Sequence, residues 1–219
     1  MTNGVKSWSY SAYALYDQCP QKYKYVKIDK MKEPQSEALE RGNRIHKLGE
    51  RFLLDQTKTV PVEYRHFASM LEQLKELEPF VEQEWGFDKS WRESGYRDWN
   101  KTWFRAKLDA GHIYPDKTAE AIDFKTGKLY KTNEDQVELF GAVMMTRYPQ
   151  VTHVTTRLWY LDSGDEIIRE YTAADRPNII KKWEQKVGPL FADQKWAPKP
   201  GPLCKWCHFR KDNGGPCRF

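Results

Sequence analysis

The sequence contains no long apolar run. No stretch of its 219 residues approaches the roughly 18 consecutive apolar residues of a membrane-spanning helix. The first residues, MTNGVKSWSY, also lack the apolar core of a secretory signal peptide. The sequence therefore predicts a cytoplasmic protein that has no contact with a membrane.

Cysteine is scarce, with four residues in the chain. In a reducing cytoplasm, cysteines are more often metal ligands or reduced thiols than members of disulfides. Internal repeats and low-complexity tracts are absent as well. The length is ample for a central sheet with helices around it, so we predict one domain over residues 1–219.

Neither sign of charge dominates. The 36 Lys and Arg residues against 31 Asp and Glu residues give a net charge of +5 and a pI of about 8.9. This mild basic bias suits nucleic acid, but it also suits many unrelated proteins. Aromatic residues are abundant, with nine Trp, twelve Tyr and ten Phe. Because bases stack on exposed aromatic faces, this abundance favours single-stranded nucleic acid as a partner.

The densest chemistry lies in residues 104–140. Over residues 104–110 the side chains alternate between apolar and polar, which predicts a strand. Asp109 falls on the polar side of that strand. We therefore expect its carboxylate to point away from the apolar face.

A second strand is predicted over residues 119–125, after a turn-like stretch. In this strand Asp123 and Lys125 share one face, opposite Ile122 and Phe124. If the two strands pair as a hairpin, this aspartate and lysine converge with the aspartate of the first strand. An α/β fold with a mixed sheet fits the order of helices, hairpin, helix and further strands.

Two neighbouring aspartates and a lysine predict a particular chemistry. Close carboxylates raise each other's proton affinity unless a cation lies between them, and hard oxygen ligands favour Mg²⁺ or Mn²⁺. Beside such an ion, Lys125 can orient a water or offset charge on a phosphorus, which favours phosphodiester hydrolysis. The alternative is a surface hairpin with ordinary salt bridges, because Asp-x-Lys is common.

An early helix is predicted over residues 36–54. Gly42, His46 and Gly49 fall on one stripe of this helix. Glycine in a helix interior costs about 1 kcal/mol relative to alanine, so two on one stripe indicate close approach by another backbone or a ligand. By itself, a lone histidine on such a face is more often a hydrogen-bonded core residue than a ligand.

The remaining elements are predicted from periodicity alone. A tyrosine-rich N-terminal helix begins at Ser9 or Ser11 and ends or bends at Cys19-Pro20. Helical spacing in residues 61–85 indicates core packing, and a first strand near Trp85 follows. The later elements are a helix over 135–148, strands over 151–161 and 166–171, and a last helix over about 173–193.

The C-terminal tail carries three of the cysteines. Cys204 and Cys207 form a Cys-x-x-Cys pair, which places two thiolates on one side of a turn, and Cys217 follows. Cys19 can supply a fourth ligand if the tail folds back onto the N-terminal helix. Four sulfur ligands suit zinc and a 4Fe-4S cluster about equally, and replacement of one cysteine by His208 would favour zinc.

The motif from Ile122 to Lys128, followed by Gln136, resembles the PD-(D/E)XK nuclease superfamily. Within it the sequence is similar to the RecB- and AddB-like branch and to CRISPR-associated exonuclease relatives with an iron-sulfur cluster. The resemblance implies a restriction-endonuclease-like core. It also implies a catalytic lysine at Lys125 and the start of a glutamine-and-aromatic motif at Gln136. Phe140 stands where a tyrosine is usual in that motif.

The same resemblance implies a metal site. Asp109 and Asp123 would be ligands, and the Gly-x-x-x-His motif ending at His46 would provide a third. In relatives a glutamate near the first strand can reach the active site, and Glu84 is our candidate for it.

For the cysteines, the resemblance favours a 4Fe-4S cluster over Zn²⁺. Cys19 and residues 204–217 would join the two ends of the chain through that cluster. The gap between Cys207 and Cys217 is longer than we expect for the pattern.

These features predict a metal-dependent DNA exonuclease with a preference for single strands or free ends. It would act in recombination, repair or phage DNA processing, with a helicase as a possible partner, and in the host cytoplasm if phage-encoded. Arg105, Lys128 and Lys131 are near enough in sequence to contact phosphates. The alternatives are a non-catalytic nucleic-acid-binding or adaptor module and, less favoured, an RNA nuclease.

Overall fold

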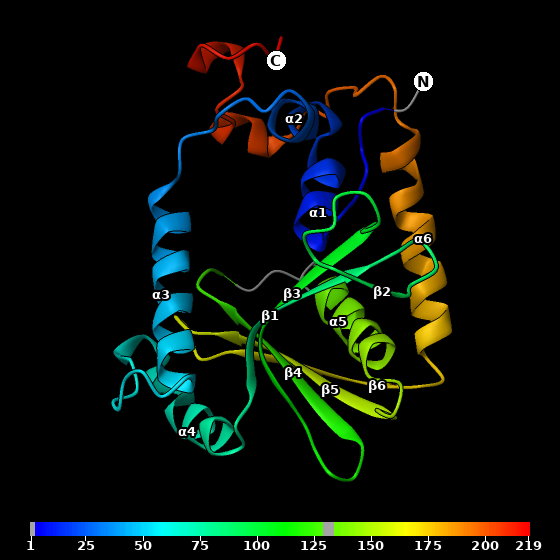
Figure 1. Ribbon diagram of the computed structural model, residues 1–219. Coiled ribbons are helices and arrows are strands. Elements are labelled where there is room, and N and C mark those ends of the chain that lie inside the picture. Colours follow the sequence, from blue (N-terminus) through cyan, green and yellow to red (C-terminus); the bar gives the residue numbers. More distant parts are fainter. Residues whose placement is uncertain (1–2, 129–133) are drawn as a thin grey trace.

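A six-stranded sheet forms the centre of the computed structural model, which describes residues 3–128 and 134–219 (Figure 1). The strand order is β2-β1-β3-β4-β5-β6. Neighbouring strands are antiparallel except for β4 and β5, which are parallel, so the sheet is mixed as predicted. The strands are β1 (Phe80–Phe87), β2 (Glu93–Ser94), β3 (Phe104–Ile113), β4 (Thr118–Lys125), β5 (His153–Tyr160) and β6 (Glu166–Thr172).

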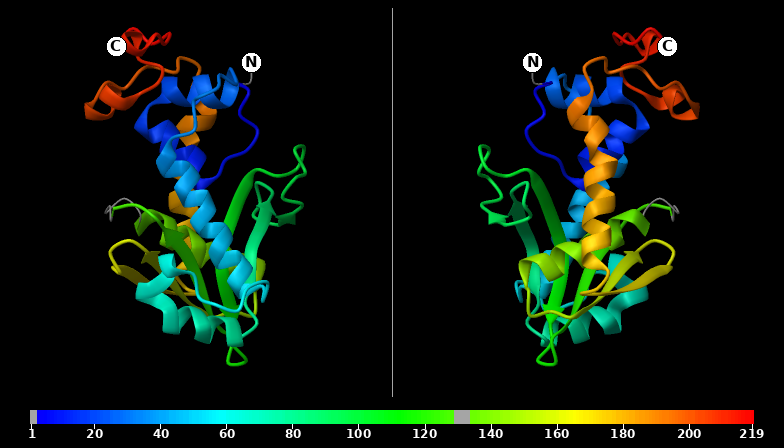
Figure 2. Two further views of the ribbon diagram at one scale, coloured as in Figure 1. Left: turned by 90° about the vertical axis from the view of Figure 1, so that its left-hand side faces the viewer. Right: turned by 90° about the vertical axis from the view of Figure 1, so that its right-hand side faces the viewer.

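Helices cover both faces of the sheet (Figures 1 and 2). The helices α3 (Glu37–Leu53) and α4 (Ala68–Glu76) share one apolar core with β4 and β5. The helices α5 (Glu134–Arg147) and α6 (Arg176–Ala192) share the other core with β1 and β3. This arrangement is the α/β fold that the order of elements predicted.

Short helices complete the chain, most of them near its two ends. They are α1 (Tyr10–Gln18), α2 (Pro20–Tyr23), a π-helical turn (Lys24–Ile28) and 3₁₀ turns at Val62–Phe67, Pro202–Trp206 and Lys211–Asn213. Ser9 caps α1, because its hydroxyl accepts a hydrogen bond from the N–H of Ala12. In the same way Ser36 caps α3 through the N–H of Leu39.

The segment between α4 and β1 differs from its helical pattern. Helix α4 ends at Glu76, and the next residues include Glu78 in the left-handed region, with φ of 51°. Leu77 is consequently exposed, and Val81 packs from a strand and not from a helix. The helical spacing therefore overestimated the length of this helix.

The aromatic residues mostly build the core. Seven of the nine tryptophans are buried, and only Trp99 and Trp206 are strongly exposed. Trp8 stacks on Trp183 with ring centroids 5.6 Å apart, and Tyr23 stacks on Trp196 at 5.6 Å. The abundance of aromatic residues therefore reflects packing more than a surface for bases.

The two ends of the chain lie together at one end of the molecule (Figures 1 and 2). The amide of Asn3 donates to the carbonyl of Leu190 at 2.8 Å. In the tail, the Lys199 ammonium donates to the carbonyl of Asp17 at 2.6 Å, and the Cys217 thiol donates to Gln21 at 3.5 Å. The tail therefore lies beside α1 and α2, as the sequence predicted for a folded-back C-terminus. Across the described ranges, no helix combines the length and apolar character needed to cross a bilayer.

Candidate active site

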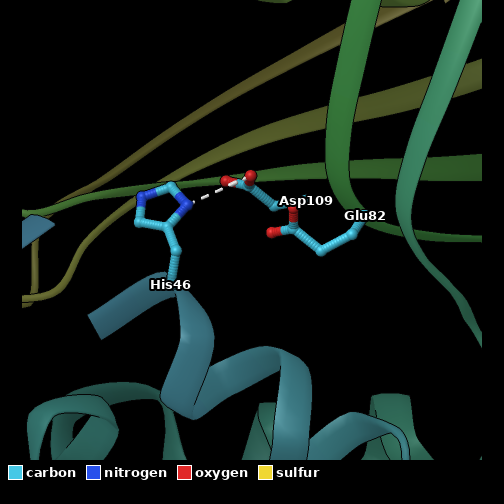
Figure 3. A group of neighbouring side chains, drawn as sticks. All are labelled: His46, Glu82 and Asp109. Carbon is cyan, nitrogen blue, oxygen red and sulfur yellow. Dashed lines mark hydrogen bonds and ion pairs between the residues drawn. The ribbon is translucent and has the colours of Figure 1, made fainter. Parts of the chain in front are cut away.

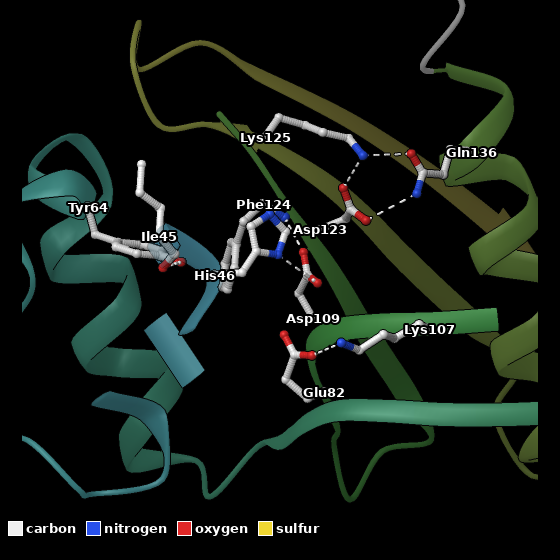
Figure 4. A network of polar contacts seen from close by, with 10 residues as sticks. All are labelled: Ile45, His46, Tyr64, Glu82, Lys107, Asp109, Asp123, Phe124, Lys125 and Gln136. Carbon is white, nitrogen blue, oxygen red and sulfur yellow. Dashed lines mark hydrogen bonds and ion pairs between the residues drawn. The ribbon is translucent and has the colours of Figure 1, made fainter. Parts of the chain in front are cut away.

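The predicted hairpin is present, and it opens at its two aspartates. Strands β3 and β4 pair from Ile113 and Ala119 as far as Ala110 and Ile122. Beyond that pair, the backbone N–H of Phe124 donates to Oδ2 of Asp109 at 2.7 Å (Figure 4). A side-chain carboxylate thus takes the place of a ladder carbonyl, and the two strands separate around it.

The alternation predicted along β3 breaks at this point. Leu108 belongs to the core under α5 and α6, whereas Ala110 belongs to the core under α3 and α4. Strict alternation would put both on one face. The break allows Asp109 to reach toward β4, and it is buried with 6% exposure. On β4 the prediction is confirmed, because Ile122 and Phe124 share the α3 side of the sheet.

His46 meets Asp109 as the resemblance implied (Figure 3). Its Nδ1 atom lies 3.1 Å from Oδ1 of Asp109. One ligand atom each from His46, Asp109 and Glu82 lie within 4.8 Å of one another. Three different elements, α3, β1 and β3, therefore bring three potential metal ligands to one point.

Glu82 is the site residue that the sequence did not single out. Glu84, the candidate chosen from the sequence, lies instead 3.7 Å from the exposed Arg97. The pairing of β1 with β3 puts Glu82 opposite Asp109, between the pairs Val81–Ala110 and Gln83–Leu108. This register joins distant segments of the chain, so no local pattern distinguishes the two glutamates.

The backbone of Glu82 is unusual for a strand, with φ of 52°. A non-glycine residue in the left-handed region costs about 1–3 kcal/mol and persists only when its surroundings impose it. Such outliers concentrate at functional sites. The conformation accompanies a carboxylate that faces His46 and Asp109 (Figure 3).

Asp123, Lys125 and Gln136 form the second half of the site (Figure 4). Gln136 of α5 accepts a hydrogen bond from Lys125 at 2.7 Å and donates one to Oδ1 of Asp123 at 3.1 Å. The Lys125 ammonium also lies 2.5 Å from Oδ2 of Asp123. The structure thus joins three residues that the sequence predicted together.

Asp123 is not part of the cluster of ligand atoms formed by His46, Glu82 and Asp109. In the described part of the chain, no set of three ligand atoms within 4.8 Å of one another includes it. Gln136 and Lys125 hold its carboxylate toward α5. Glu82 thus joins His46 and Asp109 as a candidate ligand, and the expected role of Asp123 as a ligand stays a prediction.

The electrostatics of the site follow from burial. Burial is the largest cause that raises the pKa of Asp123; the Lys125 ammonium opposes it and the charge of Asp109 adds to it. For His46, burial works to lower the pKa, but the hydrogen bond to Asp109 and the nearby carboxylates outweigh it and the pKa is raised. Both shifts reflect several carboxylates that share a poorly solvated space.

The residues fit a divalent cation. The carboxylates of Glu82 and Asp109 and the imidazole of His46 offer three ligand atoms within 4.8 Å of one another. Close carboxylates repel one another unless a cation lies between them. Carboxylate oxygens with one imidazole suit Mg²⁺ and Mn²⁺. A cavity of about 520 Å³ opens onto His46, Glu82 and Lys125.

The two glycines of α3 have specific neighbours. A Cβ on Gly49 would overlap the ring of Tyr64, whose hydroxyl donates to the carbonyl of Ile45 at 3.2 Å. A Cβ on Gly42 would lie 3.1 Å from the hydroxyl of Thr126. The close approach that the sequence indicated is therefore made by side chains: Tyr64 of the 3₁₀ turn Val62–Phe67 lies against Gly49, and Thr126, just after β4, lies against Gly42.

The three basic residues predicted to contact phosphates differ in their surroundings. Arg105 is buried, with its Nε donating to the carbonyl of Tyr96 at 2.7 Å and another nitrogen bonded to Ser7. It is therefore a structural residue and not an accessible phosphate contact. Lys128 is exposed, and Lys131 lies outside the described residues.

The four cysteines line one cavity of about 820 Å³ between the tail and the helices α1 and α2. All four are free thiols. Among the described residues, no three ligand atoms that include a cysteine sulfur lie within 4.8 Å of one another. The tail thus lies near Cys19 as predicted, but no three of the four cysteine sulfurs form a close group.

The chain belongs to the PD-(D/E)XK nuclease superfamily, whose sequence model matches residues 7–211. The protein is therefore a member of a nuclease family, and such nucleases generally use divalent metals. No curated protein matches the sequence closely enough to count as a relative.

A solved structure shares the fold of this chain. A crystal structure of a provisionally assigned exonuclease from Eubacterium rectale is similar with a TM-score of 0.53 and 11% identity. That match covers 93% of this chain and 88% of the other. SSO0001 matches with a TM-score of 0.47 and 14% identity, over 97% of this chain and 86% of its own. At these identities the likeness concerns the fold.

Proposed function

We propose that this protein is a divalent-metal-dependent deoxyribonuclease, an exonuclease that prefers single-stranded DNA or free ends. It would act in DNA recombination, repair or phage DNA processing. The observation that supports the proposal is the cluster of His46, Glu82 and Asp109 beside a cavity that His46, Glu82 and Lys125 line, in a nuclease-family fold. Asp123 pairs with the lysine of that cavity. The exonuclease assignment of the Eubacterium rectale neighbour is consistent with it.

In this proposal, His46, Glu82 and Asp109 hold the cation, with Asp123 beside them. When bound, Mg²⁺ or Mn²⁺ supplies Lewis-acid stabilisation of charge on the phosphoryl oxygens and an activated water. The N–H of Phe124 fixes one oxygen of Asp109, which leaves the other toward His46. The chain thus orients the acceptor atoms before the ion arrives.

Lys125 is the proposed catalytic lysine. Gln136 and Asp123 hold its ammonium in place from two sides. Because the side chain is only 24% exposed, its charge is poorly screened by water. A positive charge fixed there can offset the charge that develops on a phosphoryl group in the transition state. Gln136 is then a positioning residue for Lys125.

End-labelled DNA tests the proposal. The wild type and Asp123→Ala are incubated with single-stranded, duplex and circular single-stranded DNA, in Mg²⁺, in Mn²⁺ and in EDTA. Degradation of linear but not circular strands by the wild type alone, with a metal requirement, is the expected result. Strands labelled at either end give the polarity, and matched RNA tests the ribonuclease alternative. Equal, metal-independent degradation by both proteins would indicate a contaminant and favour the non-catalytic binding module.

We further propose that Cys19, Cys204, Cys207 and Cys217 hold a 4Fe-4S cluster, as in the RecB- and AddB-like branch. The shared cavity supports a common ligand. Tetrahedral zinc, with Zn–S bonds of about 2.3 Å, needs sulfurs about 3.8 Å apart, which is closer than this spread of thiols. Visible absorption with iron and zinc analysis of anaerobically purified protein decides: colourless protein with stoichiometric zinc excludes the cluster.

A further inference from the structure

Lys107 carries a second ammonium group into the same cavity as Lys125. It precedes Asp109 by two residues on β3, and its ammonium forms an ion pair with Glu82 (Figure 4). Glu82 is one of the three clustered ligand atoms. One potential metal ligand is therefore already bound by a positive charge in the cation-free protein.

Lys125 and Lys107 differ in how firmly their ammonium groups are held. Lys125 contacts both Asp123 and Gln136, and its side chain is 24% exposed. The Lys107 side chain is 50% exposed, and among the described residues Glu82 is its one ion-pair partner within 4.0 Å. Lysine has a flexible four-carbon stem and rotatable donors, so its ammonium can change partners without a backbone movement.

A divalent cation at Glu82 changes this contact. The cation and the ammonium would compete for the same carboxylate, and they repel each other at short range. Glu84 lies opposite Lys107 on β1, but it already has Arg97 at 3.7 Å. Asp109 faces His46 and the Phe124 N–H. A phosphate of a bound strand would be the nearest new partner at the cavity mouth.

We propose that Lys107 is an exchangeable counter-ion of the metal site. It neutralises Glu82 while the site lacks a cation, and on cation binding it transfers to a backbone phosphate of the DNA. Metal binding and strand binding are thereby coupled: the ion releases a group that holds the substrate. This inference rests on the proposed function, because it takes DNA and a divalent cation as the ligands.

The test compares Lys107→Gln with the wild type and with Lys47→Gln. Lys47 lines the same cavity but pairs with Glu50 of its own helix, so its loss removes a similar charge without freeing a clustered ligand. Calorimetric titration with Mn²⁺ alone should show about three- to ten-fold tighter binding for Lys107→Gln and less than about two-fold change for Lys47→Gln. Mn²⁺ should also raise the Tm of Lys107→Gln more than that of the wild type.

Strand binding supplies the second measurement. Fluorescence anisotropy with a labelled single strand is recorded in EDTA and in Ca²⁺, with electrophoresis to check that the DNA remains intact. Lys107→Gln should weaken binding several-fold in Ca²⁺ and little in EDTA, whereas Lys107→Arg should restore it. Unchanged or weaker Mn²⁺ affinity in Lys107→Gln overturns this inference, as does an equal loss of DNA affinity with and without cation. A wild type that binds no Mn²⁺ overturns the proposed function as well.

Discussion

Asp109 accepts a hydrogen bond from the backbone N–H of Phe124, with 2.7 Å between Oδ2 and N. The contact lies where β3 and β4 cease to pair, so the same carboxylate ends the backbone ladder and faces His46 and Glu82. One side chain therefore stabilises the end of the β3–β4 pairing and carries the proposed metal-ligand role. Different substitutions at this position can remove one role without the other.

Asp109→Asn should retain the fold but lose nuclease activity by about 100-fold or more, because the amide oxygen can still accept from Phe124 while the ligand charge is gone. Asp109→Ala should also unfold more easily, by about 1–3 kcal/mol, since it leaves a buried N–H unpaired. Urea denaturation and a nuclease assay on both variants measure the two effects. If both variants were equally stable, the hydrogen bond would have no role in the fold.

Gln136→Leu should lower kcat by about 10- to 100-fold with little change in KM, because it releases the Lys125 ammonium from one of its two partners. Glu134→Gln is the control on the same helix, since Glu134 forms an exposed ion pair with Arg169. Steady-state assays on labelled DNA give both parameters. A loss confined to KM would instead assign Gln136 to substrate binding.

Gly49→Ala should destabilise the protein by about 1–3 kcal/mol, because the added methyl group overlaps the buried ring of Tyr64. Gly95→Ala, in the loop after β2, is the control. Its Cβ would lie 3.7 Å from the Cβ of Asp98, an ordinary van der Waals contact, so the stability should change by less than about 0.5 kcal/mol. Thermal denaturation of both variants gives the comparison, and destabilisation of similar size in both would contradict the packing of α3 on Tyr64.

The carboxylate of Asp193 should make the free energy of unfolding depend on pH in the acidic range. Burial works to raise its pKa, but hydrogen bonds from the N–H groups of Trp196 and Lys195 and from the Tyr16 hydroxyl outweigh it, so the pKa is lowered. A lowered pKa in the folded state contributes stability above the unfolded value, near 3.9, that is lost as pH falls through the folded value.

The wild type should therefore lose stability more steeply than Asp193→Asn as the pH falls from about 5 toward 3, on either side of the unfolded pKa. Denaturation midpoints across that range measure the difference. Parallel curves would show that the carboxylate does not hold the end of α6 against α1.

The sequence by itself determined the α/β class of the fold and the faces on which some of the candidate site residues lie. The alternation of Ile122 with Asp123 and of Phe124 with Lys125 fixed the faces of β4, because side-chain direction in a strand follows from local backbone geometry. The spacing of Gly42, His46 and Gly49 likewise placed the histidine on the inner stripe of α3. These features depend on neighbours within a few residues.

Only the tertiary structure decided which acids meet. Glu82 lies beside His46 and Asp109 because β1 pairs with β3 and because the backbone at Glu82 is left-handed. Neither feature can be read from the local periodicity of apolar residues. The burial of Arg105 depends in the same way on the loop that crosses above it. Register between distant strands and strained backbone are set by the packing of the whole chain, which is why they appear only in three dimensions.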